Sequence, residues 1–480
     1  MKRVKEDMSQ ATASTGGWRW VAMNGCRLLL ATVFVLSGFV KAIDPLGTQY
    51  KIADYLQAMG LGDLLPDFLT LAASVLLSAT EFCLGVFLLF AIQRRVVSRL
   101  MLAVMLVMTP LTLWLALANP VSDCGCFGDA VKLTNWQTFW KNVVLLGAAI
   151  VVARWPLKMF RFVSEARQWI VINYTVVFII VISVWCLYDL PIFDFRPYHV
   201  GANIKEGMTM PDDAQRPEYE TTFIMEKDGR RQEFTLDDYP DSTWTFVDSR
   251  TVKTVEGYVP PIHDFSMGLL GEDGEETDIT DSVLNRRGYT MLLVSPHLEV
   301  ADDSRLDLIN ELYEYCREQS YPFYCLTAST RGAIDRWCET TGAEYPFCAT
   351  DETTLKTIIR SNPGLLLLKD GTIIRKWSHN NLPVIGEEQQ GKPLEQLPIG
   401  QLPADSVPGK IVALLLWFVL PLALLTIADR TWMWTRWLRR KGRRANGANG
   451  ANGANGTNGT NGTNGTNGAN GANGANTPHR

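Results

Sequence analysis

The chain has 480 residues and a formal net charge of −5 at pH 7, with 45 Lys and Arg against 50 Asp and Glu. Its length is sufficient for two or three domains, and its mean hydropathy of +0.02 averages very apolar and polar segments. Basic clusters such as the one at 439–444 flank apolar stretches. We therefore interpret them as membrane anchors and expect no nucleic-acid partner.

Six apolar stretches predict membrane-spanning helices, since most of them approach the roughly 20 residues that cross a bilayer. They lie at 20–40, 68–92, 100–118, 143–153, 169–188 and 411–428. The fourth has a clean apolar core of only 11 residues between Asn142 and Arg154. It spans only if the tryptophans beside it lie at the membrane interfaces, and we count it as a span because the topology requires one there.

The distribution of Lys and Arg predicts the orientation of these helices. With a cytoplasmic N-terminus, 18 Lys and Arg fall inside, in the segments 1–19, 93–99, 154–167 and 430–444. Only 4 fall in the short outside loops 41–66 and 119–141. The positive-inside rule then places both termini in the cytoplasm and residues 190–408 outside it. We expect a multi-pass protein of a bacterial cytoplasmic membrane, with its large domain on the periplasmic side.

The loop after the third span reads DCGCFG at 123–128, with Cys124 and Cys126 on either side of Gly125. On the outer face of the membrane disulfides persist, and a disulfide across one residue is strained and therefore easily reduced. Gly125 would relieve the backbone. The Cys124/Cys126 pair has three interpretations: it exchanges disulfides, it is an inert or structural pair, or it is half of a metal site. A metal ion would need two more ligands, and no histidine is near in sequence, so we expect no metal.

Two ionisable residues fall inside the predicted spans, Arg27 in the first and Glu81 in the second. Counted from the cytoplasmic ends of an antiparallel helix pair, they lie at similar depths. An ion pair between them would offset the cost of burying either charge. The alternative is a functional role, in which Glu81 relays protons or contacts a ligand in the bundle.

Three segments carry a resemblance to a known family: SGFVKAIDP at 37–45, SATEFCLGVFLLF at 78–90 and DCGCFGDA at 123–130. Together they resemble DoxX-like membrane proteins, most closely the methylamine-utilisation MauE group, over about 20–155. The resemblance implies a four-helix membrane bundle that helps disulfide-rich periplasmic proteins to mature, alongside a thioredoxin-like partner. The residues that support the motif, besides the two cysteines, are Lys41, Asp44, Pro45, Gly125, Phe127 and Gly128.

The domain outside the membrane begins with a polar segment at 190–258, whose strand-like pieces YETTFIMEK and STWTFVD predict a β-rich lead-in. Turn signals at Asp228-Gly229 and Pro240-Asp241 separate these pieces. Beyond 259 the pattern is strand (289–295), helix, strand, two helices and a hairpin with Asp370-Gly371 at its turn.

This order resembles a thioredoxin fold of the TlpA or peroxiredoxin type over about 260–380. The resemblance makes Pro363 the family's cis-proline, beside a groove that would hold a client. However, the place of the usual Cys-x-x-Cys reads SPHLEVADDSR at 295–305, which has no cysteine and whose acidic side chains would oppose a thiolate. For Cys316, Cys325, Cys338 and Cys348 we expect buried free thiols. One structural disulfide, or a redox role through these other positions, is the alternative.

The predicted fold class is therefore an α-helical polytopic membrane bundle with an extracytoplasmic α/β thioredoxin-like domain. The parts are a cytoplasmic N-terminus (1–19), a membrane domain (20–155), a fifth span (168–189), the lead-in (190–258), the α/β domain (259–400), a sixth span (410–428), a basic cytoplasmic segment (429–444) and a tail (445–480). The tail repeats Ala-Asn-Gly and Thr-Asn-Gly, which cannot build a core, so we expect it to be disordered.

The leading functional hypothesis is thiol–disulfide exchange between the Cys124/Cys126 loop and a periplasmic thiol protein, which the redox-inactive thioredoxin-like domain holds nearby. The chain's other partner is the lipid bilayer. A lipid quinone could be the other electron carrier, although no residue pattern indicates a quinone site, and the sequence predicts no other cofactor. The alternatives are a non-enzymatic assembly factor or receptor that binds a partner through the α/β domain, and a small-molecule transporter.

Overall fold

A computed structural model describes residues 17–62, 65–119, 124–211, 214–215, 218–227, 230–235, 244–255, 257–271, 273–386, 388–403 and 407–453. Most of the expected cytoplasmic N-terminus and Asp123 of the cysteine loop lie outside the described residues. Residues up to Val419 form one compact unit. The residues from Leu420 form a second unit, whose described part is the rest of helix α13 (Val407–Gly453).

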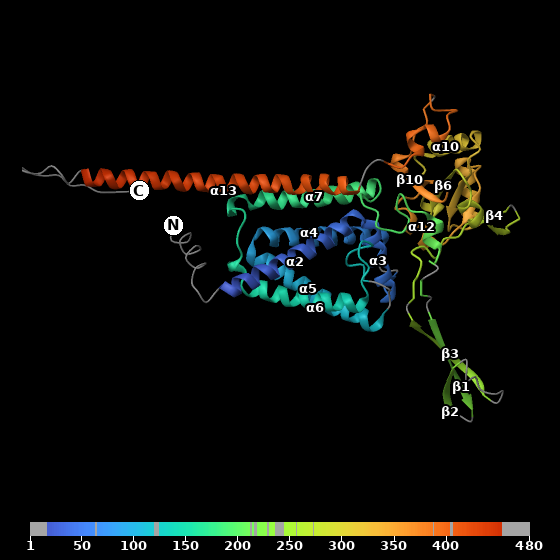
Figure 1. Cartoon of the computed structure of the whole chain (residues 1–480), viewed down its shortest axis with the longest axis horizontal. Helices are drawn as coiled ribbons and strands as arrows, with labels where there is room; N and C mark the ends of the chain where they lie inside the picture. The colour runs from blue at the N-terminus through green and yellow to red at the C-terminus, as the bar shows by residue number, and fades with distance from the viewer. Residues whose placement is uncertain are drawn as a thin grey trace, which may run out of the picture. The chain divides into compact units, whose positions relative to one another are not determined.

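Within the described residues, six helices are long and apolar enough to cross a membrane, which confirms the expected number. They are α2 (Gly17–Ile43), α4 (Asp67–Phe90), α5 (Arg94–Ala118), α6 (Asn135–Arg154), α7 (Gln168–Tyr188) and α13, whose apolar part is Val407–Arg440. Figure 1 shows α2, α4, α5 and α6 packed together as a bundle. This is the four-helix arrangement expected for the membrane domain.

The fourth span, α6, is longer than its apolar core suggested, because it begins at Asn135. The Thr134 side chain accepts a hydrogen bond from the Gln137 backbone N–H, and the Gln137 side chain accepts one from the Thr134 backbone N–H. This reciprocal capping satisfies two N–H groups that a helix start leaves without partners. The start of α6 is therefore marked by a polar capping box, which cannot be found by looking for apolar residues alone.

The first two spans, α2 and α4, approach each other closely because glycines face the contact. A Cβ added at Gly38 would lie 2.3 Å from the Phe82 backbone nitrogen, and one added at Gly85 would lie 2.8 Å from the Val35 backbone nitrogen. Small residues allow such close helix contacts in membrane proteins. The contact fixes the register of the pair, so that the C-terminal end of α2 lies beside the middle of α4.

A short helix, α3 (Pro45–Ala58), follows the first span. Asp44 caps it by accepting a hydrogen bond from the Gly47 backbone N–H at 2.9 Å, and Pro45 occupies its first position. Asp at the N-cap and Pro at the first helical position are the residues that helix starts prefer. The Asp44-Pro45 corner of the recognised motif is thus a helix start that turns the chain out of the first span.

Residues 218–255 contain a three-stranded antiparallel sheet with the order β2-β1-β3. Its strands are β1 (Glu218–Lys227), β2 (Arg230–Thr235) and β3 (Thr245–Val255). β1 covers the first piece that was predicted as a strand, and β3 begins within the second. The two predicted turns, Asp228-Gly229 and Pro240-Asp241, lie outside the described residues.

The α/β domain is built on a seven-stranded sheet of order β10-β9-β6-β7-β8-β4-β5. Its strands are β4 (Gly268–Leu270), β5 (Glu276–Asp278), β6 (Tyr289–Ser295), β7 (Phe323–Thr327), β8 (Phe347–Ala349), β9 (Gly364–Lys369) and β10 (Thr372–Ser378). β6, β7 and β8 are parallel, and β9 is antiparallel to both β6 and β10. The predicted strand–helix order and hairpin are confirmed. The prediction missed β4, β5 and β8, each of which has only three residues.

The helices of this part are α8 (Ile204–Met208), α9 (Thr280–Leu284), α10 (Leu306–Glu318), α11 (Arg331–Thr341) and α12 (Glu352–Ile358). Short 3-10 turns are η2 (Pro156–Lys158), η3 (Glu165–Arg167), η4 (Leu298–Val300), η5 (His379–Asn381), η6 (Leu394–Gln396) and η7 (Pro398–Gly400). The second of the two helices predicted before the hairpin is α12, which ends at Ile358, so that the next residues can enter the hairpin as extended chain.

Two hydrophobic cores lie on the two faces of this sheet. Every residue of β6 is buried; Met291 and Leu293 belong to the core that α10 and α11 cover, and Leu292 and Val294 belong to the other core. A strand that is buried on both faces is apolar along its whole length. This is the reason that YTMLLVS could be recognised as a strand.

The start of the expected lead-in packs with the α/β sheet. Tyr198 and Ile204 lie in its second core, and Asn203 forms a β-bridge with Thr372 of β10. The β-rich character expected for 190–258 is therefore confined, among the described residues, to the later part of that segment.

The last span continues further than expected. α13 extends to Gly453, so the first residues of the Asn-Gly repeat, which we expected to be disordered, are helical. A helix that already exists adds each further residue without a new nucleation step, and this explains why weak helix formers can extend it. Residues 454–480 lie outside the described residues.

Candidate functional site

The two cysteines of the loop face each other. The Cys124 and Cys126 sulfur atoms are 3.0 Å apart, and both are free thiols in this structure. Gly125 and Gly128 have φ angles of 62° and 51°, a left-handed backbone that residues with a side chain adopt reluctantly. The Gly128 N–H donates a hydrogen bond to the Gly125 carbonyl at 3.0 Å. The glycines thus close a tight turn that brings the two thiols together.

Three side chains from different helices hold this loop. The Tyr55 hydroxyl of α3 donates a hydrogen bond to the Cys124 carbonyl. The Ser37 hydroxyl of α2 lies 2.6 Å from the Cys126 carbonyl, and the Lys141 ammonium of α6 lies 4.5 Å from the centre of the Phe127 ring. Because each contact comes from a different helix, the loop has a defined position over the bundle.

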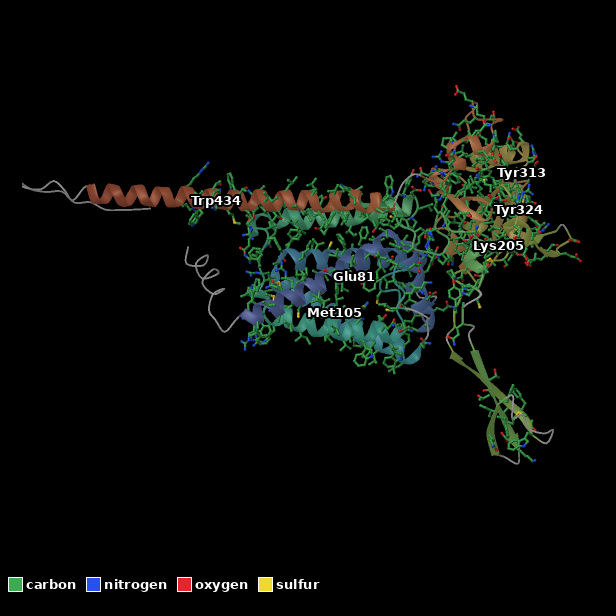
Figure 2. The ribbon with its side chains drawn as sticks, in the orientation of Figure 1. Glu81, Met105, Lys205, Tyr313, Tyr324 and Trp434 are labelled. Carbon is green, nitrogen blue, oxygen red and sulfur yellow. The ribbon has the colours of Figure 1, made fainter. Side chains whose placement is uncertain are left out.

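A buried ion pair lies beneath the loop. The Lys41 ammonium donates hydrogen bonds to both Glu81 carboxylate oxygens, at 2.7 and 2.9 Å, and only 5% and 7% of the two side chains is exposed. Figure 2 shows Glu81 within the helical bundle. The Ser37 hydroxyl lies 2.7 Å from Glu81 Oε2 and so connects the ion pair with the Cys126 carbonyl.

The expected ion pair between Arg27 and Glu81 is therefore wrong. Arg27 instead donates hydrogen bonds to the Leu88 and Phe160 carbonyls, each at 2.9 Å, and to the Leu89 carbonyl. The last carbonyls of a helix lack partners within it, and the α2–α4 register places Arg27 beside that end of α4. Counting residues from the helix ends cannot find this register, because it depends on the glycine contact between the helices.

The surroundings of the two thiols lower the pKa of Cys126 to about 6, and the cause is first the hydrogen bond from the Cys124 thiol. Burial opposes this shift, and the charges of Lys141 and Lys41 add to it. The same hydrogen bond and burial raise the pKa of Cys124. A thiolate is the nucleophilic form of cysteine, and these surroundings favour the thiolate at Cys126 and the neutral thiol at Cys124.

The α/β domain contacts the membrane domain next to this loop. Arg360 donates to both carboxylate oxygens of Asp44 at 3.0 and 3.0 Å, lies 3.7 Å from Asp129, and stacks over the Tyr50 ring at 5.1 Å. Burial opposes ionisation of Asp44, but Arg360 and then Arg196 hold the pKa of that carboxyl below its usual value. Because the Arg360 side chain is only 7% exposed, this is a buried, bidentate contact.

A cavity of about 790 Å³ borders the dithiol. Its wall includes Cys124, Cys126 and Lys41, together with Arg360 from the α/β domain. A volume of this order is typical of small-molecule sites. Within the described residues, no group of three or more His, Cys, Asp or Glu side chains is placed to hold a metal ion.

The sequence prediction put a client groove at Pro363, and the structure places this residue differently. The Asn362–Pro363 peptide bond is cis, but Pro363 is buried and does not line the cavity, whereas Arg360 does. The carbonyl of Asn362 already accepts a hydrogen bond from the Asp302 backbone N–H at 3.0 Å. The chain's own segment after β6 therefore occupies part of the space beside Pro363.

The four cysteines of the α/β domain are free thiols in the described structure. Cys316 lies in α10, Cys325 in β7, Cys338 in α11 and Cys348 in β8. Burial raises the pKa of Cys316 and of Cys348 to about 12, which disfavours the reactive thiolate.

Sequence reasoning missed Ser37, Tyr55, Lys141 and Arg360 as members of the site. Ser37 stands at the start of the recognised SGFVKAIDP segment, so its place in the motif was the available signal. Lys141 stands beside the apolar core of the fourth span, where a lysine is typical of a membrane interface. No local signal marked Tyr55 or Arg360, because each reaches the site through contacts between distant parts of the chain.

Comparisons with known proteins match separate parts of the chain. A solution structure of a candidate protein disulfide isomerase from Bacteroides thetaiotaomicron is similar at 15% identity over 25% of this chain and 76% of that protein, with a TM-score of 0.21. No curated protein matches the chain. Residues 219–256 match a domain of unknown function, DUF8463. Residues 19–154, which include the dithiol loop, match the family model of methylamine utilisation protein MauE.

Proposed function

We propose that this membrane protein exchanges disulfides with a cysteine-containing client on the periplasmic side of a bacterial cytoplasmic membrane, through Cys126 and Cys124. The observation that carries the proposal is the pair of thiols 3.0 Å apart at a cavity, with cationic side chains that favour the Cys126 thiolate. Nearby cations and hydrogen bonds to sulfur are the features that distinguish reactive cysteines from inert ones.

The exchange proceeds through a mixed disulfide. The Cys126 thiolate attacks one sulfur of a client disulfide, forms a new S–S bond with it and releases the other client sulfur as a thiolate, which takes up a proton. The Cys124 thiol then loses its proton and attacks Cys126, which forms the Cys124–Cys126 disulfide and frees the reduced client. The same steps in reverse oxidise a client dithiol, so the site itself serves either direction.

In this proposal the α/β domain is a thioredoxin-like module that holds the client. Its sequence has no cysteine at 296–305, the place of the usual redox pair, so it contributes binding rather than electrons. Arg360 attaches the domain to Asp44 next to the dithiol. A client held there reacts as if it were present at a much higher concentration.

The test is to trap the mixed disulfide in cells that express the full chain. Cys124→Ser removes the thiol that resolves the intermediate, so this variant is expected to accumulate adducts through Cys126. Adducts are detected by rapid acid quenching and non-reducing electrophoresis. The Cys124→Ser/Cys126→Ser double variant is the control and should form none. If the single variant forms no adduct and client oxidation is unchanged, the protein does not exchange disulfides.

A second candidate function is supported by the burial of the pair. Cys124 is only 9% exposed, which would suit a structural thiol pair in a membrane assembly factor or receptor whose α/β domain binds a partner without redox chemistry. The two functions differ in one observable: a receptor would capture the same partner with both loop cysteines replaced by serine, and it would capture it without any reducible adduct.

A further inference from the structure

The cavity beside the dithiol has two chemically different ends. At one end it is lined by polar side chains of the α/β domain, such as Thr357, His263 and Asp264. At the other end it is lined by Leu77 of α4 and by Met108 and Leu111 of α5. Since Cys124 and Cys126 also line this cavity, both ends have access to the same pair of thiols.

The apolar end lies within the membrane-spanning helices. Leu77 is 10 residues from the start of α4 at Asp67, and Met108 is 10 residues from the end of α5 at Ala118. At a rise of about 1.5 Å per residue, both are roughly 15 Å from the helix ends, which is within a hydrocarbon layer about 30 Å thick. Both side chains are partly exposed. A molecule that fills this end would therefore come from the bilayer rather than from water.

We propose that the apolar end of the cavity binds the ring of a lipid-soluble quinone, which oxidises the Cys124/Cys126 dithiol. This inference rests on the proposed exchange function in its oxidising direction. When the Cys124–Cys126 disulfide oxidises a client dithiol, it is itself left as a dithiol, and a two-electron oxidant must restore the disulfide. A quinone combines an apolar ring and tail with two acceptor oxygens. The Lys41 ammonium has three N–H donors, of which Glu81 takes two, so one remains for a quinone oxygen.

The reaction balances with the groups present. The Cys126 thiolate and the Cys124 thiol form one S–S bond and give up two electrons and the Cys124 proton. The quinone takes the two electrons, that proton and one further proton, and it leaves as the quinol. Lys41 is positioned to give the second proton and to regain one from water. Glu81 stabilises the ammonium before the transfer.

The test uses the purified full chain, reduced and desalted, in phospholipid nanodiscs under anaerobic conditions. A short-chain ubiquinone analogue is added, its absorbance is followed, and free thiols are counted by alkylation and mass spectrometry. We expect one quinol for each Cys124/Cys126 dithiol lost. Leu111→Trp fills the apolar end and should slow quinol formation by about tenfold or more, since overpacking opposes binding.

Leu117→Trp is the matched control, because Leu117 is on the same helix but is 69% exposed and does not line the cavity. It should reduce the quinone at the rate of the unmodified protein. Leu77→Phe provides a second filling variant from α4 if Leu111→Trp does not fold. Both filling variants should still form adducts with a client in the Cys124→Ser background.

The outcomes separate the two proposals. Client adducts without quinone reduction would overturn the quinone site and leave the exchange function standing. Quinone reduction that Leu117→Trp slows as much as Leu111→Trp would overturn the location. A dithiol that reacts with neither client nor quinone would overturn both.

Discussion

The loop cysteines of the membrane domain and the core cysteines of the α/β domain differ in the surroundings of their sulfur atoms, and these surroundings shift their pKa values differently. The pKa of Cys126 is lowered to about 6, first by the hydrogen bond from Cys124 and then by the charges of Lys141 and Lys41. Cys348 lies in an apolar core, and burial alone raises its pKa to about 12. We therefore expect the reactivity of each cysteine to follow from the charges and hydrogen bonds around its sulfur, which the number of cysteines does not reveal.

The largest expected effect is the loss of exchange in Cys126→Ser. This variant lacks the nucleophile, so client adducts should be absent in the trapping experiment even when Cys124 is retained. Cys348→Ser is the matched change in the other region. It should keep full exchange and lose about 1–3 kcal/mol of stability, because a hydroxyl is left without a partner in an apolar core. Equal loss of adducts in both variants would contradict the comparison.

The next prediction concerns alkylation by iodoacetamide, followed by mass spectrometry as a function of pH. At pH 7, a pKa of about 6 leaves most of Cys126 as thiolate, and a pKa of about 12 leaves roughly 1 in 10⁵ of Cys348 as thiolate. Because the pKa of Cys126 is lowered, its rate should fall as the pH falls through about 6. Cys348 should remain unreacted until the protein unfolds. A Cys126 rate that rises only above pH 8 would contradict the assigned surroundings.

A third prediction separates two effects of the Lys41 charge, its effect on the stability of the protein and its effect on the reactivity of Cys126. Lys41→Met leaves Glu81 buried without its partner, which should cost about 3–5 kcal/mol. The double variant Lys41→Met/Glu81→Leu replaces the pair with apolar side chains and should regain most of that stability. Its Cys126 should nevertheless alkylate more slowly at pH 6–7 than in the unmodified protein. Thermal denaturation in detergent measures the first effect, and alkylation rates measure the second.

The smallest expected effect is at the contact between the two regions. Arg360→Met removes the charged hydrogen bonds to Asp44 and should cost about 1.5–3 kcal/mol of local stability. Hydrogen exchange should become faster around α12 and at the Asp44 turn. The control is Arg331→Met, whose ion pair with Asp335 is exposed and is worth about 0–1 kcal/mol. If hydrogen exchange around α12 and the Asp44 turn is equally fast in both variants, Arg360 does not hold the two regions together.

Much of the architecture was predictable because it depends on local patterns. Apolar stretches of sufficient length determine the spans, and alternation between strand and helix patterns determines the α/β order. The cysteine loop could also be recognised, since Cys124, Gly125 and Cys126 are neighbours in the sequence. The pieces that escaped prediction are short or polar, so no hydrophobic pattern marks them. They are α3, α8, α9, β4, β5, β8 and the extended start of α6.

By itself, the sequence determined the membrane spans, the sheet domain and the position of the thiol pair, because each of these follows from residues that are close along the chain. Only the tertiary structure decided which charges meet. Gly38 and Gly85 let α2 and α4 approach, and the resulting register pairs Glu81 with Lys41, while Arg27 caps the end of α4. The contact of Arg360 with Asp44 likewise joins residues 316 positions apart. Electrostatic interactions depend on distance in space, and a helix register or a domain contact sets that distance.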